Sequence, residues 1–373
     1  MKKYIFLAIS FLVCSCQTKA PVSAPELSDG DPATYYVGTK GMNKLIFNEK
    51  YNVPIQSYKI YSSGETPAHD PANWTLKGSY DGKNWVIADE EKDQSFCSRY
   101  QEKLYTVKTP SNYTQYMLEA TTANGDTLSI GDVQFFETNL LANWEDFKYP
   151  SINFKIENPE VKGSETYRQL VQDPEEYVKY HTQKVAEILF FSAKDTMNDV
   201  RKINYTLKEY DGISAKSGNP PSVSIVYSTK HVQKSAEKSL YKLDYETRGV
   251  LYHELVHAYQ FEPKGIGSYS TNKEFWACIE GMADAVRAQA GLFDIKALRK
   301  PGGNWMDGYK TTGFFIQWLT TKDADAIRKF HLTVRDLDVW SFDKAIKSMF
   351  GPESSIESIW NEYQEYLTKS TNI

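Results

Sequence analysis

The chain has 373 residues, 41% of them hydrophobic, which is enough for two domains with buried cores. Its formal net charge is −5 and no basic block occurs, which argues against nucleic acid as a partner. Only Cys97 and Cys278 lie beyond residue 16, and two distant cysteines do not make a disulfide framework. The fold must therefore depend on its hydrophobic core.

The first residues predict the compartment. Two lysines precede an apolar run at residues 4–13, which has the length of a signal-peptide core and is too short to cross a bilayer. The run ends at Cys14-Ser15-Cys16, which resembles the bacterial lipobox and implies lipidation of Cys16, with residues 1–21 as signal peptide and anchor. We expect an exported protein, lipid-anchored to the bacterial outer membrane or cell surface, that meets the membrane through this anchor only. An ordinary cleaved secretion signal is the alternative.

Residues 22–138 have the pattern of a β-domain. Short alternating runs at 55–61 and 74–79 are separated by turn signals such as Asp81-Gly82 and Asn124-Gly125. Regular spacing of strands and turns predicts a β-sandwich.

The residues around the second run are more specific. Trp74, Gly78-Ser79 and the series Asp-Gly-Lys-Asn-Trp at 81–85, with the closing segment 130–136, resemble the discoidin-like (coagulation factor type C) sandwich. The resemblance covers about residues 28–138. It implies a possible glycan ligand for this domain, while the two tryptophans are predicted to be core aromatics.

The pattern changes after a linker predicted at residues 139–150. In the segment 151–373, residues 177–191 have helical spacing, residues 202–210 and 222–228 alternate like strands, and helical patterns dominate the rest. A small sheet followed by many helices predicts an α+β domain. We expect strand 222–228 to be the sheet edge along which an extended substrate binds.

The motif His253-Glu254-Leu255-Val256-His257 lies in a predicted helix at 243–261. Residues four apart share one face of a helix, so both imidazoles can reach one metal ion. Glu254 follows the first histidine and is placed to contact a water rather than the metal. Zn²⁺ with an adjacent carboxylate is peptide-hydrolysis chemistry, so Glu254 is predicted to be the general base.

A catalytic zinc with two histidines needs a third protein ligand, and the next predicted helix, 274–292, offers Glu280 and Asp284 four residues apart. This spacing resembles the gluzincin class, which implies that Glu280 binds the metal and that Asp284 orients a ligand histidine. In the aspzincins the third ligand is an aspartate, so the reverse assignment stays open. Gly281 is expected to let this helix approach the histidine helix closely.

Three stretches together resemble the basic secretory protein family, which is classed as peptidases. They are residues 249–260, residues 279–287 and the Trp-Met-Asp-Gly-Tyr segment at 305–315, and the similarity runs from about 151 to 367. The resemblance implies a zincin-like metallopeptidase domain acting on peptide or (glyco)protein substrates. The expected architecture is therefore multidomain, with an N-terminal all-β discoidin-like sandwich followed by an α+β zincin-like metallopeptidase domain at 151–373.

A phenol that stabilises the oxyanion is common in metallopeptidases of this type. Tyr309 is the predicted donor, with His231 and Tyr269 as weaker alternatives, and burial of Tyr309 in the core is the competing interpretation. Two other functions remain open. The first is a non-catalytic glycan- or protein-binding surface lipoprotein with a relic peptidase domain. The second is a glycoside hydrolase, which would need two carboxylates across a sugar ring.

Overall fold

The computed structural model describes residues 23–47, 51 and 53–370. The predicted signal peptide at 1–21 and the predicted lipidation site Cys16 lie outside this part of the chain. Within it, no helix has both the length and the apolar character that crossing a membrane requires. The chain divides into two compact units that are interleaved in sequence. The first comprises Met1–Ile60, Glu65–Ser95 and Thr106–Thr138, and the second comprises Tyr61–Gly64, Phe96–Tyr105 and Asn139–Ile373.

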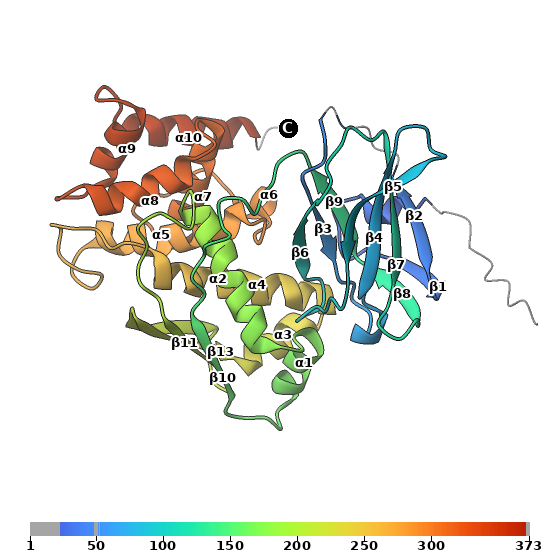
Figure 1. The fold of residues 1–373 in the computed structure, drawn as a ribbon. Coiled ribbons are helices and arrows are strands. Elements are labelled where there is room, and N and C mark those ends of the chain that lie inside the picture. The colour runs from blue at the N-terminus through green and yellow to red at the C-terminus, as the bar shows by residue number, and fades with distance from the viewer. Residues whose placement is uncertain (1–22, 48–50, 52, 371–373) are drawn as a thin grey trace, which may run out of the picture. The chain divides into compact units, whose positions relative to one another are not determined.

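The N-terminal strands form the predicted all-β sandwich (Figure 1). One sheet has the order β2-β7-β4-β5, a second has the order β6-β3-β9, and β1 pairs with β8. The strands are β1 (Tyr36–Lys40), β2 (Asn43–Phe47), β3 (Ser57–Tyr61), β4 (Asn73–Ser79), β5 (Trp85–Glu91), β6 (Glu102–Thr106), β7 (Gln115–Thr121), β8 (Thr127–Ile130) and β9 (Asp132–Phe136).

Side chains from different sheets meet in the core of this sandwich. The ring of Tyr116 on β7 stacks on that of Phe135 on β9, with ring centroids 5.4 Å apart. Phe135 also contacts the rings of Phe47 and Tyr58, at centroid distances of 5.1 and 6.4 Å. Nε1 of Trp74 on β4 donates to the hydroxyl of Tyr58 on β3 at 2.9 Å. Trp74 is thus a core aromatic, as predicted. Trp85 is only half-buried, because it begins β5 at the edge of its sheet.

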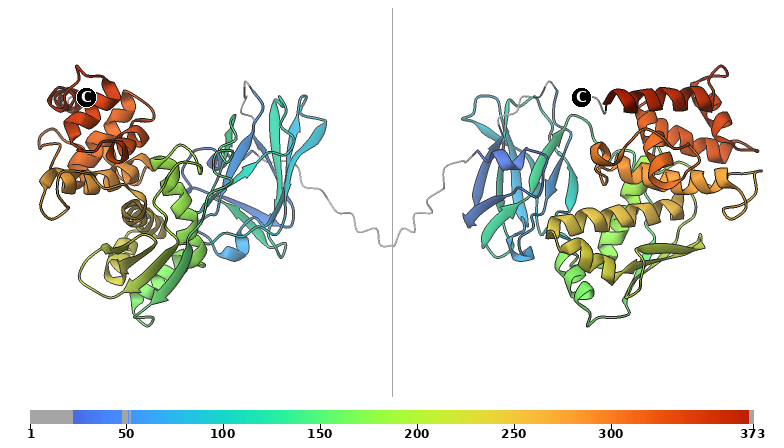
Figure 2. Two further views of the ribbon diagram at one scale, coloured as in Figure 1. Left: turned by 60° about the vertical axis from the view of Figure 1, so that its left-hand side comes forward. Right: turned by 180° about the vertical axis from the view of Figure 1, so that it is seen from behind.

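The second unit is the predicted α+β arrangement, a four-stranded sheet followed mainly by helices. Its strands are β10 (Ser151–Ile156), β11 (Lys202–Lys208), β12 (Ser214–Asn219) and β13 (Ser222–Ser228). Its helices are α1 (Lys162–Leu170), α2 (Pro174–Leu189), α3 (Thr229–Ala236), α4 (Leu240–Tyr259), α5 (Lys273–Gln289), α6 (Ile295–Leu298), α7 (Tyr309–Trp318), α8 (Ala326–Asp336), α9 (Phe342–Phe350) and α10 (Ile356–Ser370). Helix α4 lies between the sheet and α5 (Figures 1 and 2).

The order of this sheet is β10-β11-β13-β12. Strand β13, residues 222–228, is therefore interior, and the prediction that it is the edge is wrong. Only Pro220 and Pro221 separate it from β12, so β12 folds back antiparallel and covers the open side of β13. The edge nearest α4 is β12, which alternation alone did not single out because most of its residues are exposed.

Side-chain caps begin the two helices that matter for function. The Ser239 hydroxyl accepts a hydrogen bond from the backbone N–H of Lys242, and the Asn272 side chain accepts one from Phe275 N at 3.0 Å. Such caps satisfy amide groups that the first helical turn leaves without partners. Helix α4 then buries side chains on most of its faces, so its histidines are held on a rigid element.

Helices α5 and α7 approach each other closely at two glycines. A Cβ added to Gly281 would lie 2.3 Å from Cγ2 of Thr312, and one added to Gly313 would lie 2.7 Å from Cβ of Asp284. Gly281 therefore allows α5 to pack against α7, and the expectation that it faces the histidine helix is wrong. The glycine of α4 that faces α5 is Gly249, where an added Cβ would lie 2.5 Å from Nε of Arg287.

Candidate metal centre

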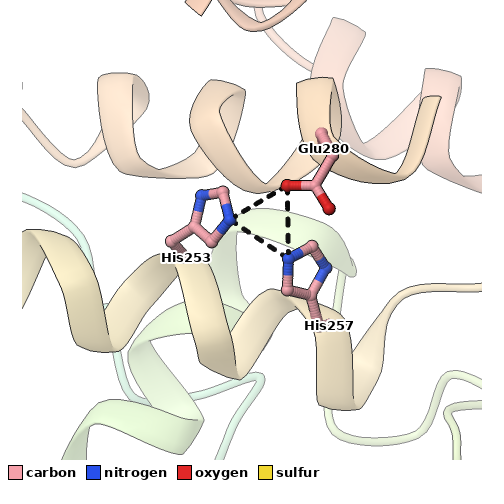
Figure 3. A group of neighbouring side chains, drawn as sticks. All are labelled: His253, His257 and Glu280. Carbon is pink, nitrogen blue, oxygen red and sulfur yellow. Dashed lines mark hydrogen bonds and ion pairs between the residues drawn. The ribbon is translucent and has the colours of Figure 1, made fainter. Parts of the chain in front are cut away.

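Two histidines of α4 and one glutamate of α5 bring three potential metal ligands together (Figure 3). Nε2 of His253 lies 3.1 Å from Nε2 of His257 and 3.2 Å from Oε2 of Glu280. The distance from Nε2 of His257 to the same carboxylate oxygen is 3.7 Å. Four-residue spacing on α4 places both rings on one face, and α5 packs its carboxylate against that face. Two imidazole nitrogens and one carboxylate oxygen form a donor set that suits Zn²⁺.

The other nitrogen of each imidazole has its own partner. Oδ1 of Asp284 lies 2.8 Å from Nδ1 of His253, and the side-chain amide of Gln260 lies 2.7 Å from Nδ1 of His257. Such contacts fix ring orientation and leave both Nε2 atoms directed at the centre. Asp284 faces the outer nitrogen rather than the group of three ligands, so the geometry favours Glu280 over Asp284 as the third ligand. A role for Gln260 was not predicted from the sequence. Its position three residues after His257, at the end of the same helix, is the signal that could have identified it.

Glu254 is 5% exposed and has different neighbours from the metal-binding group. The hydroxyl of Ser214 on β12 donates to its Oε1, and the backbone N–H of Lys216 donates to the same carboxylate. Burial raises the pKa of Glu254, although the charge of His253 and the Ser214 hydrogen bond oppose this. Ser214 and Lys216 were not predicted as site residues, because nothing local in the sequence connects them with a motif 40 residues away.

Two tyrosines border the centre. The hydroxyl of Tyr269 donates to Oε1 of Glu280 at 2.7 Å, and the ring of Tyr309 is nearly parallel to that of His253, with centroids 6.0 Å apart. Tyr309 has a left-handed backbone, with φ of 40°, which non-glycine residues rarely adopt outside functional positions. Burial and the nearby Glu280 raise the pKa of Tyr309, so its hydroxyl stays protonated near neutral pH. His231 instead packs beside Tyr227 and does not line this cavity.

The two histidines of the ligand group have opposite pKa shifts. Burial opposes protonation of His253, but hydrogen bonds to Asp284 and Glu280 outweigh it and raise its pKa to about 10. Burial and the positive charge of His253 lower the pKa of His257 to about 3. Burial also works against ionisation of Glu280, yet its contacts with both histidines and Tyr269 lower its pKa. The carboxylates thus favour a positive charge at this point, as a cation-binding site requires.

The three ligand residues, Glu254 and the two tyrosines face one cavity of about 440 Å³. Its lining residues are Ser214, Ala215, Lys216, His253, Glu254, His257, Gln260, Glu262, Tyr269, Phe275, Ile279, Glu280 and Tyr309. The predicted residues His253, Glu254, His257, Glu280 and Tyr309 therefore share one cavity, and Asp284 supports it from behind. Apolar and polar walls with several perturbed titratable groups are typical of an active site.

The second unit carries the domain described as "Peptidase of plants and bacteria", which matches residues 149–363. The match covers more than half of the chain, and the protein belongs to this family. Among curated proteins, the chain is 34% identical over 77 residues to the Arabidopsis thaliana peptide-N(4)-(N-acetyl-β-glucosaminyl)asparagine amidase. That match covers 20% of this chain and 10% of the amidase.

Several solved domains are similar to about 30% of the chain. One is the Clostridium perfringens module CpGH89CBM32-5 in complex with GalNAc-β-1,3-galactose, at 16% identity and a TM-score of 0.27, covering 30% of this chain and 82% of that one. Another is the F5/8 type C domain of a Bacteroides fragilis protein, at 12% identity and a TM-score of 0.28, covering 31% and 81%. A third is the family 32 carbohydrate-binding module of Streptococcus pneumoniae EndoD, at 11% identity and a TM-score of 0.25, covering 29% and 79%.

Proposed function

We propose that this protein is a zinc-dependent peptidase whose metal is held by His253, His257 and Glu280. The observation that carries the proposal is the convergence of their three donor atoms, all within 4.8 Å of one another, in a cavity that also holds Glu254. Zinc bound by such a group lowers the pKa of a bound water to near 7 and polarises a substrate carbonyl.

Glu254 is the general base in this proposal. Ser214 and the Lys216 backbone hold its carboxylate in place, where it can accept a proton from the attacking water and return it to the leaving amine nitrogen. A pKa raised by burial suits both steps, because a carboxylate that is too acidic would not hold the proton.

Other residues position or stabilise the reacting groups. Asp284 accepts from Nδ1–H of His253, and the amide oxygen of Gln260 can accept from Nδ1–H of His257 once that amide is turned. The hydroxyl of Tyr309 is the donor for the oxyanion, since this tyrosine lines the cavity with its ring beside that of His253. Edge strand β12 offers its open side to an extended substrate, as sheet edges do in peptide recognition.

The substrate class is peptides in extracellular proteins or glycoproteins. The partial likeness to a glycan-asparagine amidase supports a glycoprotein context, and the N-terminal sandwich is proposed to bind the glycan. The export signal at residues 1–21 and a lipid on Cys16 would place the enzyme at the cell surface.

Metal analysis and a protease assay test this function. Protein purified with supplemental zinc should contain about one equivalent of zinc and should cleave glycosylated or bare protein substrates. Chelation should abolish cleavage, and added zinc should restore it. Less than about a tenth of an equivalent of zinc would instead support the alternative of a glycan- or protein-binding lipoprotein with a relic peptidase domain.

A further inference from the structure

Lys216 points into the same cavity from edge strand β12. Ser214 and Lys216 are two residues apart, so their side chains lie on the same face of the strand, and the Ser214 hydroxyl reaches Glu254 on α4. Both residues are half-buried, whereas Ala215 and Ser217 between and beyond them are exposed. Lys216 thus lines the cavity on the proposed substrate edge, where its ammonium group is influenced by the charges of Glu262 and Glu254.

This lysine has opposite charges near it but none within ion-pair distance among the described residues. Among the described residues that line the cavity, Lys216 is the one lysine or arginine, and it forms no ion pair with a described carboxylate. Glu254 is engaged by the Ser214 hydroxyl and the Lys216 backbone, and Glu262 is exposed to solvent. Burial lowers the pKa of Lys216, an effect that the charges of Glu262 and Glu254 reduce.

We propose that Lys216 binds a carboxylate of the substrate next to the scissile bond. The inference rests on the proposed peptidase function and names a substrate preference for it. A half-buried ammonium without a close partner is costly, and a substrate carboxylate would supply a charge-assisted hydrogen bond. That carboxylate can come from an Asp or Glu side chain, which fits an endopeptidase, or from a free C-terminus, which fits a carboxypeptidase.

Cleavage-site mapping on a proteome-derived peptide library distinguishes the two sources. Internal cleavages with Asp or Glu at one fixed subsite indicate the side chain, and cleavages at a fixed distance from the C-terminus indicate the terminal carboxylate. A synthetic peptide with an amidated C-terminus then separates them directly. If the wild-type protein cleaves without either preference, the assignment of Lys216 is wrong while the peptidase function stands. If it cleaves nothing, the peptidase function itself fails.

Substitutions of Lys216 test whether this residue causes the preference for a substrate carboxylate. Lys216→Met should reduce the preference about tenfold to a hundredfold, the range for losing a charge-assisted hydrogen bond. Lys216→Glu should shift it toward Lys and Arg. Lys202→Met, at an exposed lysine on β11 outside the cavity, is the matched control and should leave the preference unchanged. An unchanged preference in Lys216→Met, with normal zinc content and thermal stability, overturns the proposal.

A binding measurement provides a readout that does not depend on turnover. An intact peptide that the wild-type protein cleaves can be titrated into the Glu254→Gln variant by calorimetry. A second peptide, in which the carboxylate is replaced by an amide, is titrated in the same way. The acidic peptide should bind about tenfold or more tightly, and adding Lys216→Met should remove the difference. Equal binding of both peptides by the variant that retains Lys216 contradicts the proposal.

Discussion

Glu254 and Glu280 lie in the same cavity but have different neighbours. The carboxylate of Glu254 accepts from Ser214, whereas that of Glu280 contacts Nε2 of both histidines and accepts from Tyr269. Burial dominates at Glu254 and raises its pKa, while the cationic and donor groups around Glu280 prevail over burial and lower its pKa. Two carboxylates with opposite pKa shifts suit a proton acceptor and a metal ligand.

Glu254→Gln should separate catalysis from metal binding. The amide keeps the size of the side chain but cannot take a proton, so zinc content should stay near one equivalent while kcat falls by about 10²–10⁴-fold. His253→Ala is the contrasting variant and should lose zinc and activity together. Metal analysis and initial rates give both quantities, and loss of zinc from Glu254→Gln would mean that its role is misassigned.

The two carboxylates of α5 should differ in their effect on zinc affinity. Glu280→Ala removes a proposed ligand and leaves two imidazoles, whereas Asp284→Asn only weakens the support of His253. We expect Asp284→Asn to cost about 10–100-fold in zinc affinity and Glu280→Ala to cost more. Competition with a chromophoric chelator measures both. Retained zinc in Glu280→Ala together with metal loss in Asp284→Asn would indicate an aspzincin-like site.

At the scale of elements, the packing of α7 on α5 supports the metal centre from behind. Gly313 of α7 faces the Cβ of Asp284 and the backbone of Ala285, so there is no room for a side chain between the helices. The same helix begins at Tyr309, which borders the cavity. One helix contact thus sets the positions of Asp284 and Tyr309 together.

Gly313→Ala should disturb both stability and metal binding. Its Cβ would lie 2.7 Å from Cβ of Asp284 and 2.9 Å from the Ala285 nitrogen, and overpacking of this kind costs about 1–3 kcal/mol. Displacement of Asp284 should also weaken zinc binding, which chelator competition would detect alongside thermal unfolding. Lys310→Ala, at an exposed position of the same helix, is the control. Unchanged zinc affinity in Gly313→Ala would show that this contact does not position Asp284.

Buried His331 on α8 should make the helices of the second unit sensitive to acid. Its Nε2 accepts from Phe261 N at 3.0 Å and its Nδ1 lies 3.2 Å from the carbonyl oxygen of Leu189, an arrangement that needs a neutral ring. Burial lowers its pKa from 6.5 to about 4. Because the unfolded chain then binds the proton more readily, the stabilisation is complete above pH 6.5 and is lost as pH falls toward 4.

The loss from this residue should approach roughly 3 kcal/mol at the acid end of that range, given a pKa change from 6.5 to about 4. Urea unfolding followed by far-UV circular dichroism between pH 7.5 and 4.5 reports it, because the described α-helices all lie in the second unit. His331→Gln should show a shallower dependence on pH. An equally steep dependence in that variant would assign the effect to other groups.

At the scale of the whole molecule, the second unit includes a segment from the N-terminal half of the sequence. Within that unit, the Cys97 carbonyl accepts from the backbone N–H groups of Gln172 and Asp173, and Arg99 N donates to the Leu170 carbonyl at 2.8 Å. Arg99 is 1% exposed, so it is fully part of this core. A division of the chain at residue 138 therefore separates the peptidase domain from part of its own core.

A fragment of residues 139–373 should consequently be less stable than the full chain. It lacks several backbone hydrogen bonds and the buried side chains of Phe96–Tyr105, a loss of roughly 3 kcal/mol or more. A fragment that begins at Phe96 keeps the segment and should recover most of the stability. Thermal unfolding of both fragments and the full chain, with zinc bound, makes the comparison. Equal stability of the 139–373 fragment and the full chain would contradict the expectation.

Local patterns in the sequence were sufficient for the β-sandwich, the α+β class and the face of α4 that carries His253 and His257. Each depends on periodicity along a single element, because residues two apart share a face of a strand and residues four apart share a face of a helix. The family resemblance of the second half, carried by short motifs on α4 and α5, is likewise confirmed.

Only the tertiary structure decided which other groups meet those motifs. Ser214 and Lys216 reach Glu254 across 40 and 38 residues of sequence, through the hairpin that makes β12 rather than β13 the edge of the sheet. The segment Phe96–Tyr105 joins the second unit across a longer separation, 73 residues from Arg99 to Gln172. Strand order and long-range contacts depend on chain reversals and on packing between elements. The hydrophobic periodicity of a single segment predicts neither the strand order nor these contacts.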